Sequence, residues 1–246
     1  MIETTTKTHI NDIYNVIKRY DRFLITTHVR ADGDGIGSEV ALYYALKRMG
    51  KSVSIANDSP IPQIYKFIIP DTGIYVHPEI PKDRAEVVFT LDCPTLDRLG
   101  KTQGIIPKDA IIINIDHHVS NEHFGKINWV SEEMCATGEI VLHLLKGGNI
   151  DITPDIATAL YVAIVTDTGR FTHSNTTPEA LRKAAFLIER GARHIEISKH
   201  VYNTNPYNLL KLNALALNTV NLHAGNRIAT QWLTRKMLVE TGINPI

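Results

Sequence analysis

Residues 27–38 read THVRADGDGIGS, which places two aspartates among three glycines directly after the apolar run FLITT. The carboxylates of Asp32 and Asp34 repel each other, and glycine is costly to order. A phosphate-binding glycine loop does not explain the stretch, because both carboxylates would repel the phosphate. A bound cation would explain it, and it predicts further ligands elsewhere in the chain.

Two familiar loop motifs fit this stretch poorly. An EF-hand loop would begin at Asp32, but Ile36 then stands at the fifth position and Tyr43 at the twelfth, where a bidentate glutamate belongs. A dinucleotide-binding loop has the spacing G-x-G-x-x-G, which the glycines of residues 33–37 do not have. A metal site shared with other segments is the interpretation that remains.

Strand-like and helix-like segments alternate along the chain, which predicts an α/β fold. The strand candidates are 23–28, 52–58, 87–93, 110–116 and 126–130, and the helix candidates are 10–20, 37–50, 137–148, 153–167 and 176–191. Such alternation indicates a parallel sheet of about five strands, covered by helices on both faces. Ligands of these sheets bind at the carboxyl ends of the strands.

The character of the chain changes after residue 190. Residues 206–220 predict a linker helix, and the following residues predict a hairpin around Gly225 and Asn226. Because an isolated hairpin is marginal in water, we expect the tail to be the start of a second, incomplete domain. The predicted organisation is a main domain over residues 1–190 and a linker with this partial domain over residues 191–246.

The composition of the 246 residues limits the classes of partner. Lys plus Arg and Asp plus Glu number 26 each, which argues against an electrostatic grip on long duplex nucleic acid and leaves small anionic substrates open. The two cysteines, Cys93 and Cys135, make no disulfide framework, so a cytoplasmic location fits. We expect no membrane partner, because no apolar run approaches spanning length.

The candidate metal ligands follow predicted strands or end a predicted helix. They are His28, Asp32, Asp34, Asp92, Asp116, His117, His118 and Asp167. Any single aspartate here could instead be a turn or cap residue, but their joint placement favours a metal site. Carboxylates mixed with imidazoles suit manganese, with magnesium, iron, zinc and cobalt as competitors. Two histidines and four aspartates are too many for one ion, and they suit two ions roughly 3.5–4 Å apart that share a carboxylate.

The sequence resembles a known family at these residues. The segments HVRADGDGIGS, LDC, IDHH and VTDTGRF stand in the order of the four motifs of the DHH phosphoesterase superfamily. The stretch SNTTPEAL at residues 174–181 is most similar to the branch of bifunctional oligoribonucleases and phosphatases of 3′-phosphoadenosine 5′-phosphate (pAp). The resemblance therefore implies a metal-dependent phosphoesterase.

The resemblance also implies a role for each residue. One ion would be held by His28 and Asp32, the other by Asp34, His117 and Asp167, and Asp92 would bridge the two. His118 would face the substrate as a catalytic residue, and Asp116 would orient the histidines. Arg98, in the loop after Asp92, would contact phosphate or be a solvated surface arginine.

The implied reaction is hydrolysis of short oligonucleotides, of pAp, or of both, by water activated at two divalent ions. The alternatives are an inorganic pyrophosphatase, a cyclic- or linear-dinucleotide phosphodiesterase, and a nucleotide-binding domain without turnover. The implied partner is a short oligonucleotide or a small phosphorylated nucleotide, and a homodimer is possible. Complete members of the branch carry a second domain, DHHA1, with a GGGH-like motif; the only paired glycines here, Gly147 and Gly148, lie elsewhere.

Overall fold

The structure is a computed structural model that describes residues 2–76 and 85–243. The chain divides into two compact units, Met1–Ile197 and Ser198–Ile246, and each is described by itself. The first unit extends past residue 190 because the short helix α6, His194–Ile197, packs against helix α4, Pro154–Asp167.

A six-stranded parallel sheet in the order β3-β2-β1-β4-β5-β6 forms the centre of the first unit. The strands are β1 Arg22–Thr26, β2 Ser52–Asn57, β3 Ile74–Val76, β4 Val87–Leu91, β5 Ile111–Asp116 and β6 Ile127–Val130. The predicted α/β class and parallel sheet are confirmed. The sheet has one strand more than expected, because β3 is a three-residue edge strand that is only half-buried and gives no apolar run.

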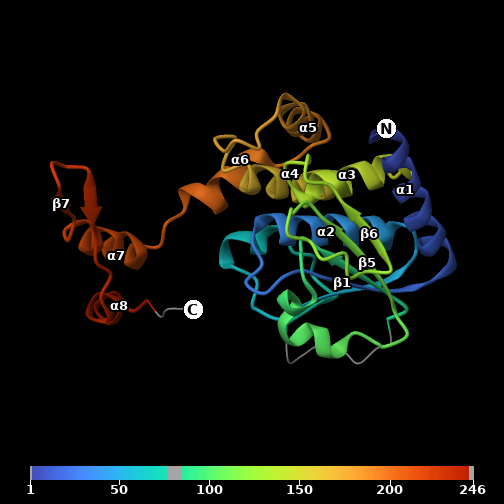
Figure 1. Cartoon of the computed structure of the whole chain (residues 1–246), viewed down its shortest axis with the longest axis horizontal. Helices are drawn as coiled ribbons and strands as arrows, with labels where there is room; N and C mark the ends of the chain where they lie inside the picture. Colours follow the sequence, from blue (N-terminus) through green and yellow to red (C-terminus); the bar gives the residue numbers. More distant parts are fainter. Residues whose placement is uncertain (1, 77–84, 244–246) are drawn as a thin grey trace. The chain divides into compact units, whose positions relative to one another are not determined.

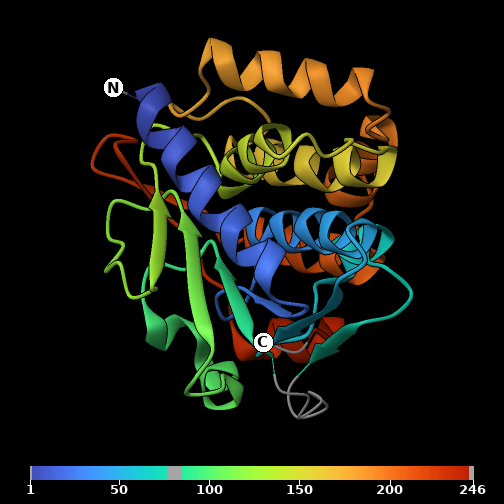
Figure 2. The ribbon, with the colours of Figure 1, turned by 90° about the vertical axis from the view of Figure 1, so that its right-hand side faces the viewer.

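Helices are stacked in layers over one face of the sheet. The helices of this unit besides α4 and α6 are α1 Ile2–Arg19, α2 Gly33–Arg48, α3 Thr137–Gly147 and α5 Pro178–Glu189, with the 3₁₀ helices η1 Gln63–Ile68 and η2 Leu96–Ile105. Helix α2 lies on the sheet, α3 and α4 lie over α2, and α5 is outermost (Figure 1 and Figure 2). Among the described residues, no helix is both long and apolar enough to cross a membrane.

The opposite face of the sheet is covered by residues around η2. Leu24, Ala56 and Val88 form a buried cluster on that face, against which Ile105 and Ile106 pack. The central strand β4 is buried on both sides along its whole length, as expected for an inner strand of a parallel sheet.

Helix α2 begins at Gly33, four residues before the predicted start at residue 37, because Asp32 caps it. The Asp32 Oδ1 atom accepts hydrogen bonds from the amides of Asp34 (3.0 Å) and Gly35 (3.2 Å). A Cβ atom on Gly37 would overlap the Ala159 carbonyl of α4. The glycines of residues 33–37 therefore form the first turns of a helix that packs closely, and they are not a flexible loop.

The second unit contains the π-helical turn η3 and the elements that follow it. They are η3 Ser198–Asn203, α7 Tyr207–Leu217, β7 Asn221–His223, β8 Ile228–Thr230 and α8 Arg235–Thr241. The hairpin predicted around Gly225 and Asn226 forms, with antiparallel β7 and β8 and positive φ at Gly225 (66°) and Asn226 (65°). Helix α7 packs against α8, where Lys211 Nζ lies 3.2 Å from Glu240 Oε1.

Glu39 is a buried acid in the middle of α2, between that helix and the sheet. Its Oε2 atom accepts a hydrogen bond of 2.9 Å from Asn57 Nδ2, while its Oε1 atom is buried without a hydrogen-bond partner of favourable geometry among the described residues. Burial raises the pKa of Glu39 to about 8. The folded protein therefore holds a proton on Glu39 that the unfolded chain releases above its ordinary pKa of 4.5.

We expect Glu39→Gln to remove a pH-dependent loss of stability. Between pH 4.5 and about 8 the folded state binds one proton more than the unfolded state, so the free energy of unfolding falls as the pH rises. The fall from this one group is at most about 1.4 kcal/mol per pH unit. Thermal unfolding in EDTA at pH 5.5 and 8.0 checks this. The melting temperature of the variant should exceed that of the wild type by a larger margin at pH 8.0 than at pH 5.5. An equal margin at the two pH values would contradict the raised pKa of Glu39.

Candidate metal centre

The predicted ligands meet at the carboxyl edge of the sheet. His28 lies just after β1, Asp92 just after β4, and Asp116 ends β5 immediately before His117 and His118. Two further elements bring the remaining carboxylates: Asp32 and Asp34 stand at the start of α2, and Asp167 is the last residue of α4. The expectation that Asp167 ends a helix is met, so this ligand comes from a helix that packs on α2 rather than from a strand.

Three groups of side chains place their ligand atoms within 4.8 Å of one another. The groups are His28, Asp32 and Asp92; Asp34, His117 and Asp167; and Asp92, His117 and His118. The first two groups coincide with the two ligand sets expected for separate ions. The third shows that Asp92 is near the second set as well as the first.

Asp92 faces both sets with different oxygen atoms. Its Oδ2 lies 3.5 Å from His28 Nε2, and its Oδ1 lies 3.7 Å from His117 Nε2. The backbone of Asp92 is in the left-handed region, with φ of 53°. Non-glycine residues rarely adopt this conformation, and such strain clusters at functional sites. The arrangement fits a bridging carboxylate.

His117 is the centre of the second group. Its Nε2 atom lies 3.6 Å from Asp34 Oδ2 and 3.8 Å from Asp167 Oδ2. That nitrogen is buried and has no hydrogen-bond partner within residues 2–76 and 85–243. A buried nitrogen left without a hydrogen bond among carboxylates is the pattern expected of a metal ligand.

The charges of the cluster also call for a cation. Burial and the neighbouring carboxylates of Asp92, Asp167 and Asp32 raise the pKa of Asp34 well above its usual range. Burial lowers the pKa of His28, but hydrogen bonding to Asp32 and Asp92 outweighs it and raises that pKa to about 10. Divalent ions replace protons at such ligands. The residues present therefore fit bound divalent metal.

The start of α3 holds Asp34 in place. The amides of Thr137 (2.6 Å) and Gly138 (2.9 Å) donate to its two carboxylate oxygens, and the Ser38 hydroxyl donates to Oδ1 at 3.3 Å. The Thr137 hydroxyl also donates to Asp92 Oδ1 at 3.1 Å. Thr137 was not predicted as a site residue; its position as the first residue of the predicted helix 137–148 was the available signal.

His118 is oriented by a chain of polar side chains. Asp116 Oδ1 lies 2.7 Å from His118 Nδ1, and Asn121 Nδ2 donates to Asp116 Oδ2 at 2.6 Å. The hydrogen bond to Asp116 raises the pKa of His118, whose side chain is 42% exposed. His118 Nε2 is the ring nitrogen that Asp116 does not bind, and its contact with a substrate stays a prediction. Asn121, three residues after the histidine pair, was not predicted.

Arg98 lies beside the first ligand group. Its Nη2 atom is 3.3 Å from His28 Nδ1, and its carbonyl accepts a hydrogen bond of 2.7 Å from the amide of Val29. The residue is exposed. Its guanidinium is therefore close enough to the cluster to meet an anion there, and its contact with substrate stays a prediction.

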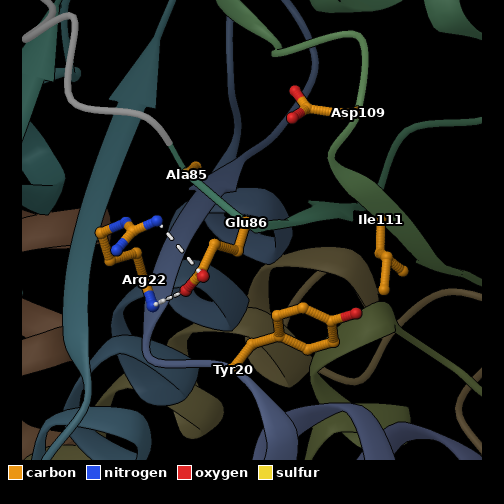
Figure 3. Close-up of a pocket in the computed structure, with 6 residues that line it drawn as sticks. All are labelled: Tyr20, Arg22, Ala85, Glu86, Asp109 and Ile111. Carbon is orange, nitrogen blue, oxygen red and sulfur yellow. Dashed lines mark hydrogen bonds and ion pairs between the residues drawn. The ribbon is translucent and has the colours of Figure 1, made fainter.

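A pocket of about 240 Å³ lies at the amino-terminal ends of strands β1, β4 and β5, whereas the metal cluster lies at their carboxyl ends (Figure 3). It is lined by Tyr20, Arg22, Ala85, Glu86, Asp109 and Ile111. Glu86 accepts hydrogen bonds from the backbone amides of Asp21 (3.2 Å) and Arg22 (3.1 Å), and it pairs with the Arg22 guanidinium. These contacts join the starts of β1 and β4, so the pocket has a structural explanation and is separate from the cluster.

The family model for the N-terminal domain of the DHH family matches residues 22–164. This chain belongs to the DHH family. The match covers the segments that bear every predicted ligand except Asp167, which lies just beyond its end.

Among DHH proteins, the chain is 34% identical over 209 residues to the bifunctional oligoribonuclease and PAP phosphatase of Thermus thermophilus, a match covering 85% of this chain and 62% of that relative. It is 26% identical to the protein of the same name from Bacillus subtilis, over 94% of this chain and 72% of the relative. The solved structure of an exopolyphosphatase-related protein from Bacteroides fragilis superposes with a TM-score of 0.90 at 26% identity, covering 96% of this chain and 72% of that one. The chain thus spans less than two thirds of the Thermus relative.

Thr137→Val should destabilise the metal-free protein by about 1–3 kcal/mol, because it removes a hydrogen-bond donor from the buried Asp92 carboxylate. Urea unfolding in EDTA measures this. Thr102→Val is the matched control, since the Thr102 hydroxyl is equally buried but has no hydrogen-bond partner among the described residues. Equal effects of the two substitutions would show that the Thr137 hydroxyl does not support Asp92.

Proposed function

We propose that this chain is a metal-dependent phosphoesterase that hydrolyses short oligonucleotides and pAp. The observation that carries the proposal is the pair of ligand groups at the carboxyl edge of the sheet, His28 with Asp32 and Asp92, and Asp34 with His117 and Asp167. Asp92 also lies 3.7 Å from His117 of the second group. Two adjacent groups of hard oxygen and imidazole ligands match the two-metal sites that catalyse phosphoryl displacement.

The ligand sets of the proposal follow the first two groups. His28 and Asp32 would hold one divalent ion, and Asp34, His117 and Asp167 would hold the other. Asp92 groups with the first set and lies 3.7 Å from His117 of the second, so it would belong to both. Manganese is the favoured ion because it accepts carboxylate and imidazole together. Bound ions supply a water activated near neutral pH and offset the charge that develops on the phosphoryl oxygens.

The residues outside the ligand sets act on the substrate. His118 is held by Asp116 with one ring nitrogen toward solvent, so it can donate a proton to the leaving oxygen. Arg98 lies beside His28, where its guanidinium can bind a non-bridging phosphate oxygen. Buried carboxylates around the cluster would repel an anion, and these two cationic groups offset that repulsion.

The proposed substrates are those in the names of the Thermus and Bacillus relatives. The Thermus and Bacillus proteins are named as oligoribonucleases and PAP phosphatases, and the matches extend over most of this chain. Short oligonucleotides and pAp both present a phosphate next to a nucleoside. The net charge of zero agrees with a small substrate rather than long duplex nucleic acid.

We expect the chain with Mn²⁺ to release mononucleotides from a trinucleotide RNA and inorganic phosphate from pAp, and to lose both activities in EDTA. Chromatography of the RNA products and a phosphate assay measure this. Inorganic pyrophosphate and a cyclic dinucleotide serve as competing substrates. Hydrolysis of either of these alone would replace the proposal, and no hydrolysis of any substrate would indicate a binding domain.

His118→Ala should reduce kcat by roughly 10²–10⁴-fold, because it removes a group that acts in proton transfer, while leaving Mn²⁺ content unchanged. Asp92→Ala should abolish turnover and reduce Mn²⁺ content, because it removes a carboxylate that lies beside His28 of one set and His117 of the other. Single-turnover kinetics and metal analysis of the purified proteins distinguish these outcomes. Loss of metal from the His118 variant would mean that His118 is a ligand.

A further inference from the structure

Asn175 is a half-buried side chain at the cluster that neither the ligand sets nor the proposed chemistry uses. It lies in the loop between α4 and α5. Its Nδ2 atom is 3.1 Å from Asp167 Oδ2, 3.2 Å from the Asp167 carbonyl and 3.0 Å from the Cys135 carbonyl. All three neighbours are acceptors, so this end of the side chain must be the amide nitrogen.

We propose that Asn175 is a positioning residue that fixes the carboxylate of Asp167 for metal binding. The inference rests on the proposed function, because it assumes that Asp167 is a ligand. Asp167 ends α4, and Cys135 precedes α3 by two residues. The side-chain amide of Asn175 therefore joins the Asp167 carboxylate, at the end of α4, to the backbone just before the start of α3.

The hydrogen bond to the Cys135 carbonyl links Asn175 to the rest of the ligand set. The residues directly after Cys135 and Ala136 are Thr137 and Gly138, whose amides hold Asp34. Asn175 therefore sets the position of Asp167 relative to the same backbone segment that positions Asp34. These two carboxylates lie with His117 in one group.

Asp167 needs such a restraint more than Asp34 and Asp92 do. Asp34 and Asp92 are 1% and 2% exposed, so packing limits their movement, but the Asp167 side chain is 26% exposed. Burial and repulsion from Asp92 and Asp32 act against its charge, while His117 attracts it, and a rotation toward solvent would relieve the burial and the repulsion. A carboxylate oxygen has two lone pairs, so Asp167 Oδ2 can accept from Asn175 and still face an ion.

Asn128 provides a matched control. It is a half-buried asparagine of β6 whose amide donates to the Gly125 carbonyl at 2.7 Å and whose oxygen accepts from the Gly125 amide at 2.9 Å. Asn128→Ala therefore also removes a side-chain amide that holds backbone. Asn128 belongs to none of the three ligand groups.

The test is equilibrium binding of Mn²⁺ to the full chain by isothermal titration calorimetry. It is combined with the melting temperature of each protein in EDTA and in Mn²⁺. We expect Asn175→Ala to weaken binding of one ion by about 10–100-fold, the usual effect of losing an outer contact to a ligand. Its gain in melting temperature on adding Mn²⁺ should shrink accordingly. Asn128→Ala should lower the melting temperature in EDTA yet keep the wild-type affinity and the wild-type gain.

Each other outcome is decisive. If Asn175→Ala binds Mn²⁺ as the wild type does, Asn175 is only structural and the inference is overturned, whereas the proposed function stands. If the wild type itself binds no Mn²⁺, the proposed function fails, and the inference with it. Asn175→Ser is the second variant if the alanine variant does not fold. If neither variant folds, the Asn175 side chain is required for folding, and the positioning role is overturned.

Discussion

Repulsion among carboxylates that are removed from water is the constraint on which the centre of this protein depends. Asp34 and Asp92 are almost fully buried, and Asp167 lies against the same imidazole as Asp34. A donor from outside the ligand set holds each of the three. The backbone amide of Thr137 donates to Asp34, and its hydroxyl donates to Asp92. The side-chain amide of Asn175 donates to Asp167. Hydrogen bonds to ionised groups are strong enough to hold such a geometry, but they do not remove the demand for positive charge.

The packing of α2 on α4 makes these contacts possible. Gly33 and Gly37 bring the two helices close, since a Cβ atom at either position would overlap Thr166 or Ala159 of α4. The start of α2 and the end of α4 then lie beside the carboxyl edge of the sheet, where β1, β4 and β5 deliver their own side chains. The helix ends contribute carboxylates that the parallel sheet alone could not bring to the site.

Most of the fold could be predicted because its signals are local. The inner strands are near-continuous apolar runs, and caps such as Thr153 and Thr177 mark the starts of α4 and α5. The misplaced or missing elements lack such signals. Edge strand β3 is too short to have a periodicity, and the first turn of α2 is hidden by glycines, whose weak helix propensity is overridden by packing against α4.

By itself, the sequence determined which residues are placed at strand ends and helix ends, and therefore which side chains could be ligands. That information is local, because a strand in an α/β sheet presents its last residues at one edge wherever it lies. Only the tertiary structure decided that Asp92 faces two groups, and that Thr137 and Asn175 support them. Those contacts join residues 45 and 8 positions apart in the chain, and the Thr137 contact depends on how α3 packs against α2 and α4, a long-range arrangement that no local pattern encodes.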